Sequence, residues 1–268
     1  MPTSDSKGPD LQRSLTLLWA GRSRGKRGPR PRLTAEQIAA AAIRIADADG
    51  LDALSMQRIA ADLGCATMSI YNHIPSKDLL LEVAADVAAG KPPEIDGAPD
   101  FRHAVRHWVG ALWAGFQTHP WLLRVPLDHT PIGPNQLAWL DRLLRPLLAV
   151  GLAPGEARAA ALHLTAVVRG TAQISIDMGN AHKTDDGRPR TEAELVRALS
   201  DLVDPDDYPA LATVHAAESA AGRPGVDEPD GDALPAEVGF GVDRFLDGIE
   251  AWAATAAKRN DHRRDGQV

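Results

Sequence analysis

Two stretches of this 268-residue chain carry the side chains best suited to bind a polar or charged partner. These side chains are cations and hydrogen-bonding groups. One stretch, RSRGKRGPRPR at 22–32, is rich in arginine and lysine and has no acidic residue. The other, TMSIYNH at 67–73, offers hydroxyl, amide and imidazole groups, and Lys77 follows it. Positive charge neutralises phosphates, and hydrogen-bonding groups read base edges. The two stretches therefore indicate contact with a nucleic acid.

Residue patterns typical of enzymes are missing from the sequence. It contains no His-Glu-x-x-His pair for a metal, no glycine-rich phosphate loop and no serine elbow. Its carboxylates form no isolated pair inside an apolar run. We therefore expect no enzymatic activity, no metal site and no cofactor. A helical enzyme with an incidental DNA-binding motif is the weaker alternative.

Cysteine usage and apolar runs bear on the compartment. Cys65 is the only cysteine, so no disulfide forms within one chain, which fits a reducing cytoplasm. A small packed side chain is a commoner role for such a cysteine than a redox switch. The apolar run at 15–20 is too short for a secretory signal, and nothing approaches the roughly 20 apolar residues of a membrane span. We expect a cytoplasmic protein.

The bulk composition favours helices. Apolar residues make up 44% of the chain, with alanine and leucine dominant and few tyrosines or phenylalanines, which favours helix over sheet. The formal net charge of −7 by itself opposes DNA binding. However, the acidic surplus lies mostly downstream of the basic stretch, so the charge is segregated. We expect an all-α protein.

Start and stop signals divide residues 34–78 into short helices. Thr34 begins a capping box at the start of the first helix, and Gly50 suits its end. Ser55 can cap the second helix. Gly64 is placed for a sharp turn before a third helix, which Pro75 ends. This is the layout of a helix-turn-helix module, which lays one short helix in a DNA major groove.

The third helix has two different faces. Ile70 and Ile74 are one turn apart and should be buried in the core of the module. The side chains left on or near the outer face are Thr67, Met68, Ser69, Tyr71, Asn72 and His73. Ser76 can cap the next helix. The side chains of that helix expected to face inward are Leu79, Leu80, Val83 and Val87.

Residues 34 to about 88 resemble the DNA-binding domain of the TetR family of one-component transcriptional repressors. The resemblance rests on the run Ile70-Tyr71-Asn72-His73-Ile74 with Lys77 after it, which follows the family's pattern of apolar residue, Tyr, any residue, His and apolar residue. It implies that phosphates are held by Tyr71, His73 and Lys77. It also implies that base edges are met by Gln57, Thr67, Met68 and Ser69.

Residues 1–33 form a separate N-terminal segment ahead of the DNA-binding domain at 34–90. Residues 11–20 could be a short amphipathic helix or a docking strip. The basic stretch after them is broken by glycine and proline and should be extended. Beside a helix-turn-helix module, Arg27, Arg30 and Arg32 can contact phosphates or enter the minor groove. The alternative is a solvated tail.

Residues 91–268 are expected to form a larger helical domain for effector binding and dimerisation. Apolar spacing predicts helices near 101–118, 137–148, 155–178, 195–202, 208–221 and 237–257, with a kink at Pro146. The run FGVDRFLDGIEAW at 240–252 resembles the last helix of tetracycline-repressor-like members, which implies a homodimer through the helices near 155–178 and 237–257. The stripe that would serve this seam, or fill the monomer's own core, is Val238, Val242, Phe245, Ile249, Trp252 and Ala256.

A small-molecule effector is expected in the same helical domain. The candidate contacts are Trp108, Trp113, Phe116, His119, Trp121, Trp139, His163, Arg169 and Gln173. Each could instead be an ordinary core or surface residue. Tetracycline-binding relatives carry a histidine where this chain reads Val125-Pro126-Leu127, with His129 and Thr130 nearby. We therefore expect no tetracycline–magnesium ligand.

These observations point to a ligand-responsive DNA-binding transcriptional regulator, a repressor released from a pseudo-palindromic operator by a small-molecule effector. Its expected partners are double-stranded DNA, a second copy of the chain and the effector, with no membrane. The main alternative is a DNA-binding regulator or architectural protein that takes no small-molecule ligand.

Overall fold

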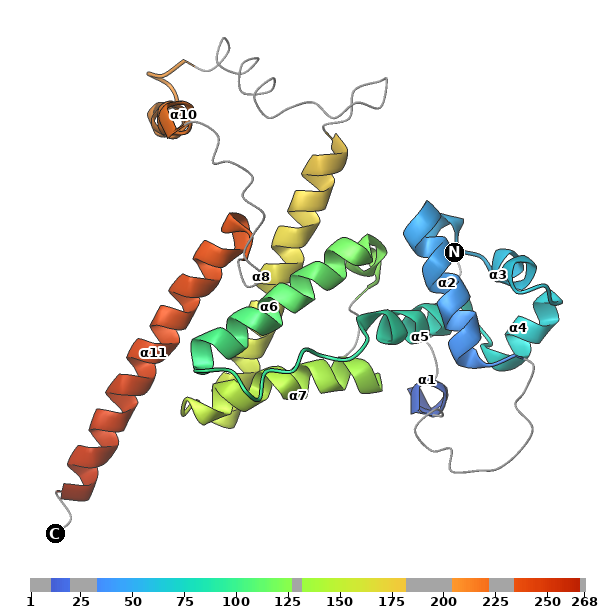
Figure 1. Ribbon diagram of the computed structural model, residues 1–268, viewed down its shortest axis with the longest axis horizontal. Coiled ribbons are helices and arrows are strands. Elements are labelled where there is room, and N and C mark those ends of the chain that lie inside the picture. Colours follow the sequence, from blue (N-terminus) through green and yellow to red (C-terminus); the bar gives the residue numbers. More distant parts are fainter. Residues whose placement is uncertain (1–10, 20–32, 127–131, 182–203, 222–233, 266–268) are drawn as a thin grey trace, which may run out of the picture.

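The computed structural model describes residues 11–19, 33–126, 132–181, 204–221 and 234–265 (Figure 1). Every regular element in these ranges is a helix, which confirms the all-α prediction. Arg27, Arg30, Arg32, the predicted helix at 195–202 and residues 129–130 lie outside the described residues. None of the described helices is both long enough and apolar enough to cross a lipid bilayer.

The N-terminal part is a bundle of short helices. Its elements are α1 (Leu11–Trp19), α2 (Ala35–Asp49), η1 (Leu51–Ala53), α3 (Met56–Asp62), α4 (Thr67–His73) and α5 (Lys77–Ala89). Thr34 forms the predicted capping box of α2, and Ser55 and Ser76 accept a first-turn N–H of α3 and α5. Gly50 and Gly64 have positive φ angles of 79° and 62°, a conformation that glycine adopts without steric cost. We call α2 to α5 the head.

The head is held together by one apolar cluster. Ile38 of α2, Ile59 of α3 and Ile70 of α4 belong to it and are fully buried. The expectation that Val87 also faces this core is wrong, because its side chain is 37% exposed. In the last turn of α5, Ala88 still packs on the cluster, while Asp86 bonds to the start of α7. Val87 itself lies at the surface.

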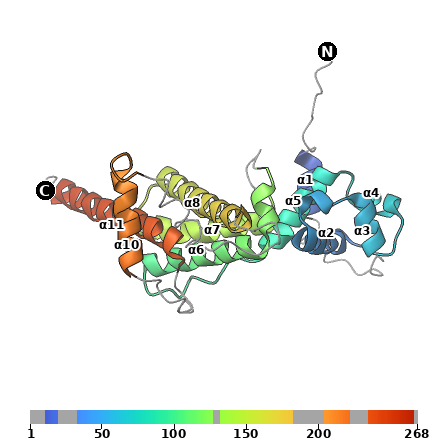
Figure 2. The same cartoon turned by 90° about the horizontal axis from the view of Figure 1, so that it is seen from above.

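The C-terminal part, which we call the body, is built from longer helices. Its elements are α6 (Phe101–Thr118), η2 (Pro120–Arg124), α7 (Pro134–Ala149), α8 (Pro154–Ala181), α10 (Pro209–Ala221) and α11 (Ala236–Asp265). α6 has the predicted bounds, and α11 continues past the predicted end at 257. Pro146 lies inside α7 as expected. Figure 2 shows the head at one end of an elongated molecule and the far end of α11 at the other.

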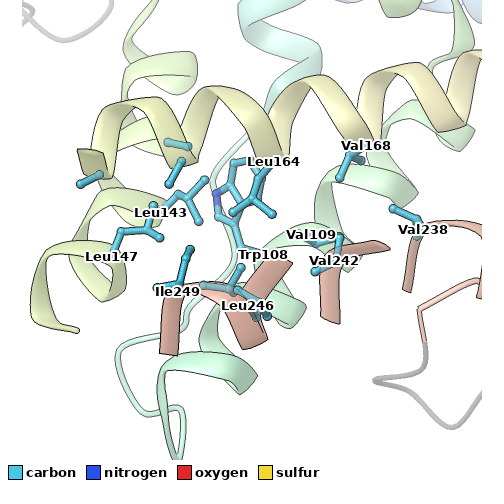
Figure 3. Packing of buried hydrophobic residues seen from close by; sticks show 14 of the residues in the cluster. Trp108, Val109, Leu143, Leu147, Leu164, Val168, Val238, Val242, Leu246 and Ile249 are labelled. Atoms are coloured by element: carbon cyan, nitrogen blue, oxygen red, sulfur yellow. The ribbon is translucent and has the colours of Figure 1, made fainter. Parts of the chain in front are cut away.

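The body has its own apolar core, to which α6, α7, α8 and α11 all contribute (Figure 3). Trp108, Leu143 and Leu164 meet there, and the side of α11 that faces them carries Val242 and Leu246. Part of the α11 stripe therefore fills the core of its own protomer, and the dimer contact expected of α11 stays a prediction. The buried members of the stripe are Val238, Val242 and Ile249.

A reciprocal pair of helix caps joins the head to the body. Asp86 of α5 is 3% exposed, and its Oδ1 accepts the backbone N–H groups of Asn135 and Gln136 at 3.0 Å each. These belong to the first turn of α7, where N–H groups have no partner within the helix. In return, Trp139 of α7 donates its indole N–H to the carbonyl of Ala89 at 2.9 Å, at the end of α5. Each helix thus satisfies an end of the other.

The reciprocal caps require close approach at Gly133. A Cβ at this position would lie 2.1 Å from Oδ1 of Asp86. We predict that Gly133→Ala displaces the carboxylate and lowers the free energy of unfolding by about 1–3 kcal/mol, as overpacking does. Urea unfolding at fixed protomer concentration measures this. Gly155→Ala is the matched control, because nothing lies within 4 Å of its Cβ; equal stability of the two variants would contradict the prediction.

Candidate nucleic-acid interface and effector domain

One side of α4 is firmly anchored in the head, and the opposite side, its outer face, is polar and exposed. Ile70 and Ile74 are 0% exposed and fix the helix to the head. Met68 is 66% and Tyr71 41% exposed, and Asn72 is exposed beside them. A seven-residue helix has no stability of its own, so these two isoleucines determine where the outer face points. This face can enter a groove without losing its hold on the core.

The other predicted DNA contacts of the head lie at the surface as well. Gln57 is exposed in the first turn of α3, and Lys77 is exposed at the start of α5. Thr67, Ser69 and His73 are partly exposed on α4. Figure 1 shows α3 and α4 together at the tip of the head, remote from α11. Helix-turn-helix geometry thus gathers residues 57 and 67–73 at one end of the molecule.

Two arginines of the head that sequence reasoning left unassigned are tied to carboxylates. Arg58, next to Gln57, donates to Asp49 at the end of α2. Arg44 of α2 donates to Asp62 at the end of α3, with 2.6 Å between nitrogen and oxygen. Both pairs are largely exposed, so they contribute little stability. They link α3 to α2 at the surface and engage both cations with carboxylates.

His119 and Trp121, two of the predicted effector contacts, connect the body to the head. The indole N–H of Trp121 donates to Oδ1 of Asp47 on α2 at 2.7 Å, and Nδ1 of His119 lies 2.8 Å from the same oxygen. Trp121 is 3% exposed and belongs to the apolar cluster of the head, although η2 follows α6 of the body. Sequence reasoning missed Asp47, because its partners lie more than 70 residues away.

Trp108 and Trp139 form a second aromatic contact between α6 and α7. Their rings meet edge to face with 5.6 Å between centroids, and the indole N–H of Trp108 donates to the carbonyl of Trp139 at 3.0 Å. The Trp139 indole N–H is engaged at the end of α5. Both ring N–H groups are therefore taken up by the protein itself.

The remaining effector candidates lie along α6 and α8. Phe116 is 7% exposed, and the guanidinium of Arg169 lies 6.0 Å from the centre of its ring. His163 of α8 stacks on Phe245 of α11 at 4.5 Å. Gln173 donates to Asp177 at 2.9 Å. Trp113 is partly buried against the body core. No group of three potential metal ligands occurs among the residues that the structure describes.

One side of α8 is apolar and uncovered. Leu162, Ile174 and Met178 are 71%, 61% and 54% exposed. Ala166 and Gly170 lie between them at the same four-residue spacing and are exposed too, so they form one face of the helix. Small residues at the centre of such a face let a second helix approach closely. We call residues 162, 166, 170, 174 and 178 the α8 face.

A helix-turn-helix head on a larger helical body defines a DNA-binding transcription regulator. The family model for bacterial regulatory proteins of the tetR family matches residues 38–84, and the model for the tetracyclin repressor-like C-terminal domain matches residues 93–252. The chain belongs to the TetR family, as the sequence resemblance indicated. As a member it is a DNA-binding regulator that works as a homodimer.

Individual relatives agree with this assignment. The HTH-type transcriptional repressor DrrR1 from Streptomyces coeruleorubidus is 33% identical over 258 residues, which cover 94% of this chain and 90% of the relative. The structure of apo ActR from Streptomyces coelicolor is similar in fold, with a TM-score of 0.67 at 23% identity, covering 85% of this chain and 99% of ActR. ActR in complex with actinorhodin gives a TM-score of 0.64 at 25% identity, covering 84% and 98%.

We predict that Ala166→Arg converts the dimer into a monomer. The substitution puts a guanidinium at the centre of the α8 face, and an unpaired charge buried in an interface costs about 3 kcal/mol or more. Analytical ultracentrifugation over a concentration series measures the dissociation constant. The control is Ala114→Arg, at an exposed position of α6. A dimer that survives the change at 166 would place the interface elsewhere.

Proposed function

We propose that this protein is a repressor. Its two heads bind a pseudo-palindromic operator, and a small molecule releases it from the DNA. The observation that carries the proposal is α4, a short helix pinned by two buried isoleucines with a polar, exposed outer face. The family assignment and the relative named as a transcriptional repressor support it. Since the protein forms a homodimer, two such helices meet successive grooves about one helical turn apart or more.

In the proposed complex, side chains on the tip of α4 and on α3 read bases. Met68 is 66% exposed and offers an apolar contact for a thymine methyl. Gln57 can pair two hydrogen bonds with an adenine, and the hydroxyls of Thr67 and Ser69 accept or donate to several bases. Discrimination then depends on these four side chains, which lie on two helices locked together by the head core.

Phosphates are assigned to the residues around this reading surface. The proposed contacts are Tyr71, Asn72, His73 and Lys77, together with Arg27, Arg30 and Arg32 of the basic stretch. Phosphate contacts fix the orientation of the head and supply most of the affinity, which makes binding depend on salt.

The effector is proposed to bind the body between α6 and α8. ActR, whose fold is similar, has been crystallised in complex with actinorhodin and with (S)-DNPA, which supports a ligand-taking body. The contacts we retain are Trp113, Phe116, His163, Arg169 and Gln173. We leave out Trp108, Trp121 and Trp139, whose indole N–H groups are bonded within the protein, and His119, whose Nδ1 meets Asp47.

The chemistry of Arg169 suggests the kind of effector. Its guanidinium bonds to neutral carbonyl oxygens and to no carboxylate of the described residues. Burial lowers the pKa of Arg169, since the charged form is desolvated. An acidic group would relieve this cost, and the adjacent Phe116 ring offers a stacking surface. We propose that the effector is an aromatic molecule with an acidic group. We also propose that the regulator is not an enzyme and that it works in the cytoplasm.

Substitutions on α4 should separate affinity from specificity. Tyr71→Ala removes a phosphate contact and should weaken binding to all duplexes by the same factor. The loss of roughly 0.7 kcal/mol of binding free energy in each of the two heads corresponds to about a tenfold lower affinity. Met68→Ala should change the preferred base at one position of each half-site by about 1 kcal/mol. Selection from random duplexes, followed by titration of the selected sites, measures both.

Gln117→Ala, at an exposed position of α6, serves as the control for both substitutions. Unchanged base preference in Met68→Ala and in variants at 57, 67 and 69 would show that specificity resides elsewhere.

The ligand response has a test of its own, with actinorhodin and salicylate as probes. We expect a probe that binds the body to raise Tm and to release the selected operator. Arg169→Gln should weaken both effects together, because they depend on one site. A regulator without a small-molecule ligand predicts no change in either quantity, and this outcome would favour the alternative.

A further inference from the structure

Arg169 of α8 holds the end of the short helix η2 through three backbone carbonyls. Its guanidinium donates to the backbone oxygens of Leu122 at 3.2 Å, Leu123 at 2.6 Å and Val125 at 3.0 Å. The last carbonyls of a helix have no partner within it, and the planar fork of arginine can serve several of them at once. One side chain therefore ties the end of η2 to α8.

The start of η2 packs into the apolar cluster of the head. Trp121 is buried in the apolar cluster of the head and bonds to Asp47 of α2. His119, immediately before η2, meets the same carboxylate. A second link to the head, Arg124 with Asp52, has side chains that are 53% and 84% exposed and contributes little. A continuous series of contacts thus leads from α8 through Arg169, η2 and Trp121 to α2.

Because of the position of α8, the contacts between Arg169, η2 and the head also affect how the two heads of the dimer are placed. α8 carries the uncovered apolar face at 162–178, on which we expect the two protomers to meet. Any group that fixes the head relative to α8 consequently fixes the distance between the two heads of the dimer. The connections that do so include the η2 series and the reciprocal caps that join α5 to α7, which packs on α8. Close to the caps, Trp19 of α1, a helix that packs on α5, also donates its indole N–H to the carbonyl of Ile132 at 3.0 Å.

We propose that Arg169 is a positioning residue that sets the spacing of the two DNA-reading heads by holding η2 against α8. The proposal rests on the proposed function and names the step at which the body controls it. Loss of the Arg169 contacts leaves η2 held to the body by the packing of Leu123 and Leu122 on the body core, and we expect the buried caps at Asp86 then to act as a hinge. The head then pivots about α5 and α7 while each protomer stays folded. An effector group that takes the guanidinium away from the carbonyls has the same result.

The test measures the distance between the heads directly in the full-length homodimer. Cys65 is replaced by serine, and a spin label is attached to Ala61→Cys, an exposed position of α3. With one label per protomer, pulsed electron spectroscopy yields one inter-head distance distribution. We expect a narrow distribution for the otherwise unchanged chain and a broader, shifted one for Arg169→Ala and for Asp47→Ala. Arg169→Lys, which keeps the charge but lacks the fork, should be intermediate.

The same variants should also bind a selected operator more weakly. If the competent spacing is then populated about one tenth of the time, the apparent affinity falls about tenfold. Arg124→Ala is the matched control, because it removes only the exposed link of η2 and should leave distance and affinity unchanged. Melting temperature and sedimentation, measured on the same samples, show that the variants remain folded and dimeric.

The outcomes separate the two proposals. Unchanged distance distributions in both Arg169→Ala and Asp47→Ala would overturn the positioning role, whatever the protein does on DNA. A distribution that responds as expected in a protein that binds no duplex would leave the positioning role intact and overturn the proposed repressor function. The absence of any inter-head signal in the labelled chain that carries no substitution at 169 or 47 would contradict the dimer and both proposals with it.

Discussion

The burial of Ile70 and Ile74 is the constraint on which DNA recognition in this protein depends. α4 has only seven residues, too few to be stable outside the protein. Its orientation therefore comes from the head core, where α2, α3 and α5 close around the two isoleucines. Because apolar packing of this kind admits little displacement, the outer face is presented in one direction. The polar side chains on that face can be varied without disturbing the scaffold behind them.

The connection between head and body follows a different physical rule. It is made largely of hydrogen bonds that satisfy helix ends: Asp86 serves the start of α7, Trp139 the end of α5, and Arg169 the end of η2. Unsatisfied helix ends are costly when buried, so each of these bonds resists loss. They are also directional, and a shift of one helix must break a defined bond. A joint of this kind has discrete arrangements, which is what a ligand-controlled switch requires.

We expect the helices of the body to use different sides for their own core and for the dimer. In α11, Val238, Val242 and Ile249 are used within the protomer. The α8 face, in contrast, has no cover in the single chain. The periodicity of a sequence indicates that a helix has an apolar stripe, but it does not indicate what packs on that stripe. The sequence therefore left both uses of the α11 stripe open. Solvent exposure in the folded protomer shows that Val238, Val242 and Ile249 serve the core.

The sequence by itself determined the elements of the head, because caps, turn glycines and apolar spacing act over three or four residues. It gave the buried sides of α4 and the bounds of α6 on the same local grounds. Only the tertiary structure decided where Asp47, Asp86 and Arg169 find their partners. These contacts join residues 44 to 74 positions apart, and no local pattern encodes them. Separations of 31 to 74 residues likewise explain why the sequence did not reveal the hydrogen bonds that Trp108, His119, Trp121 and Trp139 make within the protein.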